Sequence, residues 1–387
     1  MGVVFVRFEK IKVLYVVDNL SFGGGERGFG QLCTGLNRDR FQTHLAAHPG
    51  GKLEEMVHGA GVSFFPIDMS RKVNLSTIGH LSRLISQNRI DIVHSMGARA
   101  DFFARLACRK MSSTAVLCTV AMLIESYDVG FFIKVVYKIA DRYSARYVTQ
   151  YIAVSKALKD RLIEECGIPA DRISVIYNGV ELDQYNPNLY ALDEVRRSLG
   201  ITGDYSVIGT IGRLVYQKGF SYFLEAAKRV WSERRQVRFV IVGHGPEEAN
   251  LKSLAESLGI SHVCTFAGLR FDTARLLSAF DVFVLSSVLE GLPRVVIEAM
   301  AMGRPIVASD IDGVREEVRH NETGILVPPA DPIALADAIL SLLDDREKAE
   351  RLGREARKDA EEIFDLENTL SNIEMLYEKI LNSMSSK

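Results

Sequence analysis

Residues 281–302 of this chain read DVFVLSSVLEGLPRVVIEAMAM. The first five residues form a short apolar run, which is typical of a buried parallel strand. Pro293 suits the first turn of a helix, and the residues from Val295 to Met302 continue that helix. The stretch therefore predicts a strand, a loop and a helix, which is the repeating unit of an open α/β sheet.

Two carboxylates flank this corner between strand and helix. Glu290 falls in the loop after the strand, and Glu298 falls one to two turns into the helix. Ligands of open α/β sheets bind at the carboxyl ends of the strands, where the N–H groups of a helix N-terminus also favour anions. The corner therefore predicts an anion site with two carboxylates that can bind hydroxyl groups, which suits a nucleotide sugar. The alternative interpretation is two surface glutamates.

A second loop between a strand and a helix, residues 209–220, carries Arg213 and Lys218. A diphosphate leaving group gains negative charge as its bond to a sugar breaks, and two cations at a strand end would stabilise that charge without a metal. Arginine can bind two phosphate oxygens at once, whereas lysine acts as a point charge. A solvated charged loop is the alternative, but this loop falls in the same half of the chain as the Glu290–Glu298 corner.

Two glycine-rich turns follow other predicted strands. Residues 18–27 include Gly24 and Gly25, and residues 240–247 include Gly243. Glycine lets backbone N–H groups come close to a ligand at the start of a helix. The first turn lacks the Lys-Ser or Lys-Thr pair of a P-loop. A flexible turn is the alternative interpretation of each.

Strand-like runs alternate with helical patterns along the whole chain, which favours parallel sheets with helices on both faces. The expected strands are 11–17, 42–47, 91–94, 115–119, 151–154, 207–211, 237–243, 281–285, 305–308 and 324–327. The expected helices are one that ends near 36, then 75–88, 99–111, 129–147, one capped by Ser155, 219–231, 246–258, 272–279, 293–302 and three from 332 onward.

Length and turns divide the chain in two. At 387 residues it is long for a single core, and a turn-rich stretch at 177–187 suits a linker. We expect an α/β protein of two doubly wound, Rossmann-like domains that face each other across a cleft. The first would span 1–180 and the second 181–365, and the last helix, within 366–387, is long enough to pack back on the first domain.

Composition excludes several classes of protein. The net charge of −2 gives no case for nucleic-acid binding. The five cysteines are scattered and form no C-x-x-C pair, so they suggest a reducing compartment rather than disulfides or zinc. No apolar run is long enough to span a membrane. We therefore expect a cytoplasmic protein.

Taken together, these residues resemble the retaining glycosyltransferases of family 4. Glu290 and Glu298, with seven residues between them, resemble the E-x7-E signature of that family. The resemblance covers nearly the whole chain, because further stretches follow in the family's order, at 177–180, 212–219, 242–246 and 324–329. It implies the GT-B fold, with the donor bound mainly by the second domain and the acceptor mainly by the first.

The resemblance also implies roles for single residues. Arg213 and Lys218 would bind the donor diphosphate, Glu298 would bind the ribose hydroxyls, and Glu290 would hold hydroxyls of the transferred sugar. The remaining donor contacts would come from Gly24, Gly25, Gly243, Gly268, Leu269, Leu292, Pro293, Arg294 and Val295. The family needs no metal, so we expect no cofactor.

The chain departs from the family pattern at two places. Ala121 stands where many relatives have a histidine near the reacting sugar, and His244 stands where relatives often have aspartate. His94, at the end of another first-domain strand, is a candidate for the sugar side of the site. A histidine packed in the core is the alternative interpretation of His94.

The expected function is transfer of a hexose from a nucleoside-diphosphate sugar to a glycan or lipid-linked acceptor, with retention, in polysaccharide biosynthesis. Two alternatives are a GT-B epimerase or hydrolase of nucleotide sugars, and a non-catalytic subunit that binds a sugar nucleotide. The predicted helix around 131–143 mixes aromatic, aliphatic and basic residues, so it could lie on an anionic membrane at the inner face of the cell membrane. A packed helix with lysines that extend to solvent is the alternative.

Overall fold

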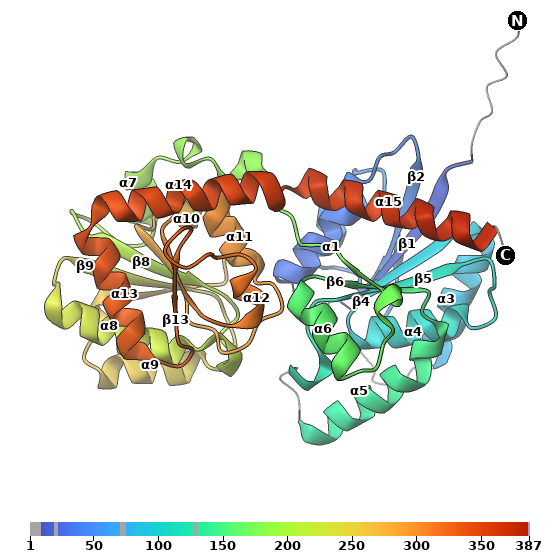
Figure 1. The fold of residues 1–387 in the computed structure, drawn as a ribbon, viewed down its shortest axis with the longest axis horizontal. Helices are drawn as coiled ribbons and strands as arrows, with labels where there is room; N and C mark the ends of the chain where they lie inside the picture. The colour runs from blue at the N-terminus through green and yellow to red at the C-terminus, as the bar shows by residue number, and fades with distance from the viewer. Residues whose placement is uncertain (1–8, 19–21, 70–74, 127–129, 386–387) are drawn as a thin grey trace, which may run out of the picture. The chain divides into compact units, whose positions relative to one another are not determined.

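Two parallel β-sheets organise the chain, one in each of two units (Figure 1). The structure is a computed structural model that describes residues 9–18, 22–69, 75–126 and 130–385. The first unit comprises Met1–Ile176 together with Thr369–Lys387, and the second comprises Tyr177–Asn368.

The first unit has a seven-stranded sheet in the order β3-β2-β1-β4-β5-β6-β7, and all its pairings are parallel. The strands are β1 (Ile11–Val17), β2 (Phe41–Ala47), β3 (Ser63–Pro66), β4 (Ile92–Met96), β5 (Ala115–Val120), β6 (Gln150–Ala153) and β7 (Ile173–Val175). The helices are α1 (Gly24–Gly35), α2 (Lys52–Val57), α3 (Leu75–Asn88), α4 (Ala98–Cys108), α5 (Phe131–Ser144) and α6 (Lys156–Glu164), with 3-10 turns η1 (Ile124–Ser126), η2 (Ala145–Tyr147) and η3 (Ala170–Arg172).

The second unit has a six-stranded parallel sheet in the order β10-β9-β8-β11-β12-β13. The strands are β8 (Ser206–Ile211), β9 (Val237–Val242), β10 (Cys264–Gly268), β11 (Val282–Leu285), β12 (Ile306–Ser309) and β13 (Ile325–Val327). The strand order reverses between β8 and β11, which is where ligands bind in doubly wound sheets.

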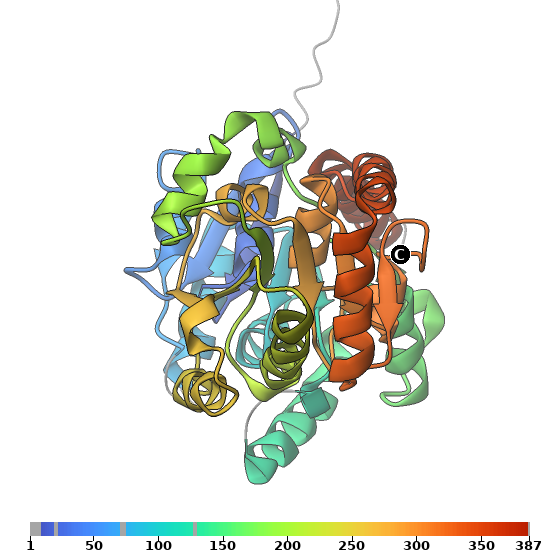
Figure 2. The same ribbon diagram turned by 90° about the vertical axis from the view of Figure 1, so that its left-hand side faces the viewer.

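The helices of the second unit range from 4 to 18 residues in length. They are α7 (Leu192–Ser198), α8 (Phe220–Glu233), α9 (Glu248–Ser257), α10 (Thr273–Ser278), α11 (Arg294–Ala301), α12 (Asp312–Arg315), α13 (Pro332–Asp344) and α14 (Arg346–Ile363), with 3-10 turns η4 (Leu182–Tyr185), η5 (Pro187–Leu189), η6 (Tyr216–Lys218) and η7 (Ser261–Val263). Helices α8 and α13 pack against each other (Figure 2). They add apolar side chains, such as Phe223 and Ile339, to the core against the sheet.

The C-terminal helix α15 (Leu366–Ser385) packs on the first unit over most of its length. The Tyr377 hydroxyl lies 2.5 Å from Nδ1 of His94 and donates to the Tyr15 hydroxyl at 3.1 Å, in a fully buried network. One turn earlier, the Glu374 carboxylate accepts a hydrogen bond from the backbone N–H of Asn37 and pairs with Arg40. The helix is therefore held by a buried polar network and a more exposed ion pair.

The structure confirms the predicted fold class and most of the predicted elements. Ser155 caps α6, because its hydroxyl accepts a hydrogen bond from the backbone N–H of Leu158. Helices α2, α7 and α12 and strands β3, β7 and β10 were not predicted from the sequence, and each of these strands lies at an edge of its sheet. Short, half-buried edge strands lack the continuous apolar run that identifies a central parallel strand.

The buried network around Tyr377 predicts a measurable loss on its removal. Tyr377→Phe leaves His94 and the Tyr15 hydroxyl without this buried partner, so the free energy of unfolding should fall by about 1–3 kcal/mol. Calorimetric unfolding of the two proteins measures this. Tyr190→Phe is the matched control, since it removes an exposed hydrogen bond to the Gln184 carbonyl. Equal losses of unfolding free energy in both variants would show that the buried network stabilises the protein no more than an exposed hydrogen bond does.

Candidate functional site

The loops that follow β8, β9 and β10 are joined through their backbones at the carboxyl edge of the second sheet. The N–H of Leu214 donates to the His244 carbonyl at 3.1 Å, and the N–H of Gly243 donates to the Gly268 carbonyl at 2.9 Å. Gly243 has φ +145°, and a β-carbon there would lie 1.8 Å from the carbonyl oxygen of Gly212. Only glycine permits this approach, so the Gly243 turn is needed to hold the loops together.

The loop after β8 is also joined to the loop after β11. The N–H of Val288 donates to the Gln217 carbonyl at 2.8 Å, and the Ser286 hydroxyl donates to the Lys218 carbonyl at 3.0 Å. Gly219 has φ +61°, and a β-carbon there would lie 2.0 Å from the Ser286 carbonyl oxygen. These contacts hold the backbone of Lys218 against the loop that carries Glu290.

Lys218 and Glu290 form an ion pair at this junction. The Lys218 ammonium donates to Oε1 of Glu290 at 2.5 Å, and the Ser287 hydroxyl donates to the same oxygen at 2.6 Å. The Glu290 side chain is only 5% exposed, whereas that of Lys218 is 22% exposed. The structure therefore brings together two predicted residues that lie 72 positions apart, with the cation nearer to solvent.

Arg213 lies in the same loop as Lys218, and its side chain is exposed. Its guanidinium makes no ion pair with any residue in the described part of the chain. An arginine in this state can bind phosphate oxygens without first breaking an internal contact.

Glu298 is buried in α11, where it pairs with Arg294 one turn earlier at 3.3 Å. The helix begins after Pro293, its N-cap, so the first N–H groups of its N-terminus lie beside Leu292 at the loop end. Arg294 and Leu292 are buried and Val295 is half-buried. Any ligand contact of this segment would thus involve backbone N–H groups more readily than the Arg294 side chain, which is paired with Glu298.

Gly268 and Leu269 end β10 and begin its loop. Gly268 has φ +66° and open space where a β-carbon would stand, and Leu269 exposes 57% of its surface. An exposed leucine beside an open glycine offers an apolar surface next to the loops described above.

The glycine turn of the first unit lies at the start of α1. Gly24 and Gly25 are exposed, and the Glu26 carboxylate accepts a hydrogen bond from the N–H of Gly23 at 2.9 Å. Residues 19–21 of this predicted turn lie outside the described residues. At the same edge of the sheet, Ala121 is half-buried in the loop after β5.

His94 is placed in the core rather than at a ligand surface. Its ring is fully buried, with Nδ1 bonded to Tyr377 and Nε2 2.6 Å from the Thr119 hydroxyl. Burial lowers the pKa of His94 to about 3, so the ring is neutral. Because both ring nitrogens already have protein partners, this geometry favours the packing role and corrects the expectation of a sugar contact.

Glu317, which the sequence analysis did not single out, lies buried near the Lys218–Glu290 pair. It is 1% exposed, and neither carboxyl oxygen has a hydrogen-bond partner among the described residues. Burial, and next the charge of Glu290, raise its pKa well above the usual glutamate value, whereas Lys218 acts in the opposite direction. The pair Glu316-Glu317 suggests a solvated surface in the sequence, so no local signal indicated its burial.

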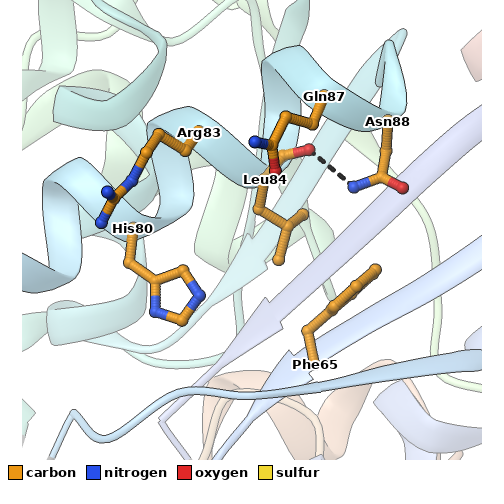
Figure 3. A pocket seen from close by; sticks show the side chains of 6 residues that line it. All are labelled: Phe65, His80, Arg83, Leu84, Gln87 and Asn88. Atoms are coloured by element: carbon orange, nitrogen blue, oxygen red, sulfur yellow. Dashed lines mark hydrogen bonds between the residues drawn. The ribbon is translucent and has the colours of Figure 1, made fainter.

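The described residues form no metal-binding cluster, and a pocket of the first unit lies apart from the predicted site residues. No group of three His, Cys, Asp or Glu side chains in residues 9–18, 22–69, 75–126 and 130–385 is arranged to hold a metal ion. Asp310 and Asp312, an Asp-x-Asp pair, both contact Arg315. A pocket of about 350 Å³ lies beside α3 in the first unit, lined in part by Phe65 and His80, and includes none of the predicted site residues (Figure 3).

Comparison with family models matches both halves of the chain. Residues 22–184 match the model described as Glycosyltransferase Family 4, and residues 192–359 match the model described as Glycosyl transferases group 1.

Individual relatives show the same similarity. The UDP-Gal:alpha-D-GlcNAc-diphosphoundecaprenol alpha-1,3-galactosyltransferase of Escherichia coli is 28% identical over 87% of this chain and 89% of its own length. EpsD of Bacillus subtilis (strain 168), a provisionally assigned glycosyltransferase, is 30% identical over 74% of this chain and 76% of its own length. Among solved structures, Anabaena Alr3699/HepE in complex with UDP and glucose superposes with a TM-score of 0.84, at 22% identity, over 95% of this chain and 100% of that one. The fold is therefore GT-B.

The raised pKa of Glu317 predicts a stability that depends on pH. Above about pH 4.5, Glu317 releases its proton in the unfolded chain but keeps it in the folded protein. The contribution of Glu317 to the free energy of unfolding is therefore complete below that pH, and it is lost as the pH rises toward the folded-state pKa. Glu317→Gln cannot ionise. Its gain in free energy of unfolding over wild type should therefore grow by more than about 1 kcal/mol between pH 5 and pH 8.

Denaturant unfolding at the two pH values measures this difference. Glu256→Gln, at an exposed position of α9, is the matched control and should show no such trend. If the free energies of unfolding of Glu317→Gln and wild type differ by the same amount at both pH values, Glu317 is not an uncharged acid in the folded protein.

Proposed function

Because this chain belongs to the glycosyltransferases, with a family 4 domain followed by a group 1 domain, we propose that it transfers a hexose from a nucleoside-diphosphate sugar to a glycan or lipid-linked acceptor with retention of the anomeric configuration. The observation that supports this most directly is the Lys218–Glu290 pair, together with Arg213, which lies in the same loop as Lys218 and has no ion pair among the described residues. The second unit would bind the donor, and the first unit would bind the acceptor.

In this proposal the diphosphate binds to Arg213 and Lys218. Arg213 is exposed and has no internal ion pair in the described structure, and Lys218 retains N–H donors beyond the one that Glu290 uses. Preorganised cations stabilise the charge that develops on the leaving diphosphate, and no step of the proposal requires a metal. The N-terminus of α11 would add backbone N–H groups and a favourable dipole.

The hexose, ribose and base of the donor would lie along the loops at the carboxyl edge of the second sheet. Glu290 would accept hydrogen bonds from hydroxyls of the transferred hexose, and Glu298 from the ribose. Gly268 and Leu269 would contact the base, because Leu269 is exposed and Gly268 leaves space beside it. Glu298 is paired with Arg294, so ribose binding would share that carboxylate with the arginine.

Retention in this proposal occurs by attack on the same face from which the diphosphate leaves. The acceptor hydroxyl oxygen forms a bond to the anomeric carbon, the bond from that carbon to the phosphate oxygen breaks, and the hydroxyl proton passes to the departing diphosphate. We assign no protein nucleophile. The contribution of the chain is orientation and stabilisation of charge.

The nature of the acceptor is supported by one relative. The E. coli enzyme is named for an acceptor that carries diphosphoundecaprenol, which is a lipid. A lipid-linked acceptor would require this protein to work at a membrane surface, in biosynthesis of a polysaccharide. No helix in the described part of this chain is long and apolar enough to cross a bilayer.

Helix α5 has the features expected of a membrane contact, and we propose that role for it. Its large apolar side chains face solvent, with exposed fractions of 83% for Phe132 and 65% for Ile139. Arg142, which is also exposed, can attract anionic headgroups. The helix lies at the outer edge of its unit in both views (Figures 1 and 2).

The polar side of α5, rather than its apolar side, attaches it to the protein. The buried Arg105 guanidinium pairs with Asp141 at 2.5 Å and contacts the Ser144 hydroxyl at 3.3 Å, while Lys138 pairs with Glu125 at 2.5 Å. Ser144 is the buried residue of the helix. An amphipathic helix whose apolar side faces solvent suits the interface of a membrane.

The donor assignment is tested by thermal shift with UDP-, GDP-, ADP- and TDP-sugars, without added metal. One sugar nucleotide should stabilise the wild type, by about 2.7 kcal/mol at 100 times its dissociation constant. Glu298→Ala and Lys218→Ala should weaken that shift, and Lys218→Ala should also lower turnover by about 10²-fold. Glu256→Ala is the control for an exposed glutamate.

Two outcomes would count against the proposal. If no sugar nucleotide stabilises the wild type, the donor site is wrong and a non-catalytic, partner-dependent protein is favoured. If Lys218→Ala turns over normally, the lysine does not stabilise the leaving group.

The membrane proposal is tested by sedimentation with phosphatidylcholine vesicles, with and without 30% phosphatidylglycerol (about one lipid in three, enough to attract basic side chains). Wild type should bind the anionic vesicles, and Phe132→Ser/Ile139→Ser should bind at least about 10-fold more weakly, because each exposed apolar side chain contributes about 1.5–3 kcal/mol on burial. Met375→Ser, an exposed apolar position on α15, is the control. Equal binding to both vesicles, or to neither, would rule out the anionic contact.

A further inference from the structure

Glu317 is a buried acid that has no partner in the described structure. It follows α12, and both of its carboxyl oxygens are shielded from solvent. An unpaired buried polar group destabilises a protein, whereas an apolar residue of similar shape at the same place would not. The placement therefore calls for an explanation other than packing.

The segment that carries Glu317 is pressed against the loop that carries Glu290. A β-carbon on Gly313 would lie 2.2 Å from the Gly291 carbonyl oxygen and 3.2 Å from that of Glu290. The two backbones are thus in direct contact. Glu317 lies four residues beyond this contact along the chain and is itself shielded from solvent.

Burial is the main cause that raises the pKa of the Glu317 carboxyl, and three charged groups also act on it. Glu290 and Glu316 raise its pKa in addition to the effect of burial, and Lys218 lowers it. The Glu316 carboxylate has another partner, because it accepts a hydrogen bond from the Tyr177 hydroxyl at 2.9 Å. The Glu317 carboxyl therefore keeps its proton, and its O–H is not used by any described group.

Donor binding would change the surroundings of Glu290. If Lys218 binds the diphosphate, as the proposed function requires, its positive charge is shared between the diphosphate and Glu290, which weakens its attraction for Glu290. Ser287 then remains on Oε1, and the Glu290 side chain is too buried for water to replace the lysine readily. A buried carboxylate that loses a charged partner is strongly destabilised unless another donor takes its place.

We propose that Glu317 is a positioning residue for this reaction: its unused O–H donates to the Glu290 carboxylate when Lys218 turns to the donor diphosphate. The proton is shared between two carboxyl groups that carry one negative charge together, and no covalent bond changes. Glu290 thereby keeps its position against the sugar while its cation serves the leaving group. This inference rests on the proposed function of Lys218.

The test compares two replacements of similar size that differ in hydrogen bonding. Glu317→Gln keeps an N–H donor, whereas Glu317→Met has none and relieves the buried polar group, so both should fold. The dissociation constant is measured by calorimetry for whichever of UDP, GDP, ADP and TDP stabilises the wild type most. Glu317→Gln should bind within about 3-fold of wild type. Glu317→Met should bind about 10-fold more weakly, which is about 1.4 kcal/mol.

A double-mutant cycle with Lys218→Met separates this role from a structural one. In the Lys218→Met background no lysine leaves Glu290 on binding, so the further change Glu317→Met should leave the dissociation constant within about 2-fold. A merely structural role would weaken binding equally in both backgrounds.

Three further results would overturn the inference. Wild-type affinity in Glu317→Met would do so while leaving the proposed function intact, because the nucleotide would still bind. Glu317→Gln as weak as Glu317→Met would show that a hydrogen-bond donor is not what matters. Failure of every nucleotide to bind the wild type would instead refute the proposed function and this inference with it.

Discussion

The ion pair of Lys218 and Glu290 is the contact on which the candidate site depends. Its two residues come from loops after different strands, and those loops meet because Gly219 lets the backbone approach the Ser286 carbonyl. Backbone hydrogen bonds also join the neighbouring loops, so the two side chains extend from loops whose backbones hold one another in place. Such rigidity matters because charged groups stabilise a transition state only if they are oriented before the reaction begins.

In the first unit, the most notable surface feature is the exposed apolar side of α5. Helix α5 is attached by Arg105 and Asp141, which leaves Phe132 and Ile139 in solvent. A buried arginine is stable only with such partners. The same unit buries His94 beneath α15, so a histidine that the sequence offered as a ligand serves instead to hold the C-terminal helix.

Much of the fold was predictable because central parallel strands are continuous apolar runs, as in Val282–Leu285. Edge strands such as β3 and β10 escaped prediction, because one side of each is unpaired and their side chains are only partly buried. The candidate residues Lys218 and Glu290 were predictable from motif spacing. Their direct contact was not, because 72 residues separate them along the chain.

The sequence by itself determined the alternation of strands and helices, the strand-to-helix corner at 290–298 and the identity of the charged residues placed at strand ends. These are local properties, since periodicity and capping depend on near neighbours. Only the tertiary structure decided that His94 is enclosed, that α5 exposes its apolar side and that Glu317 is buried near Glu290 without a hydrogen-bond partner among the described residues. Burial and electrostatic surroundings depend on segments far apart in the chain, so no local pattern can specify them.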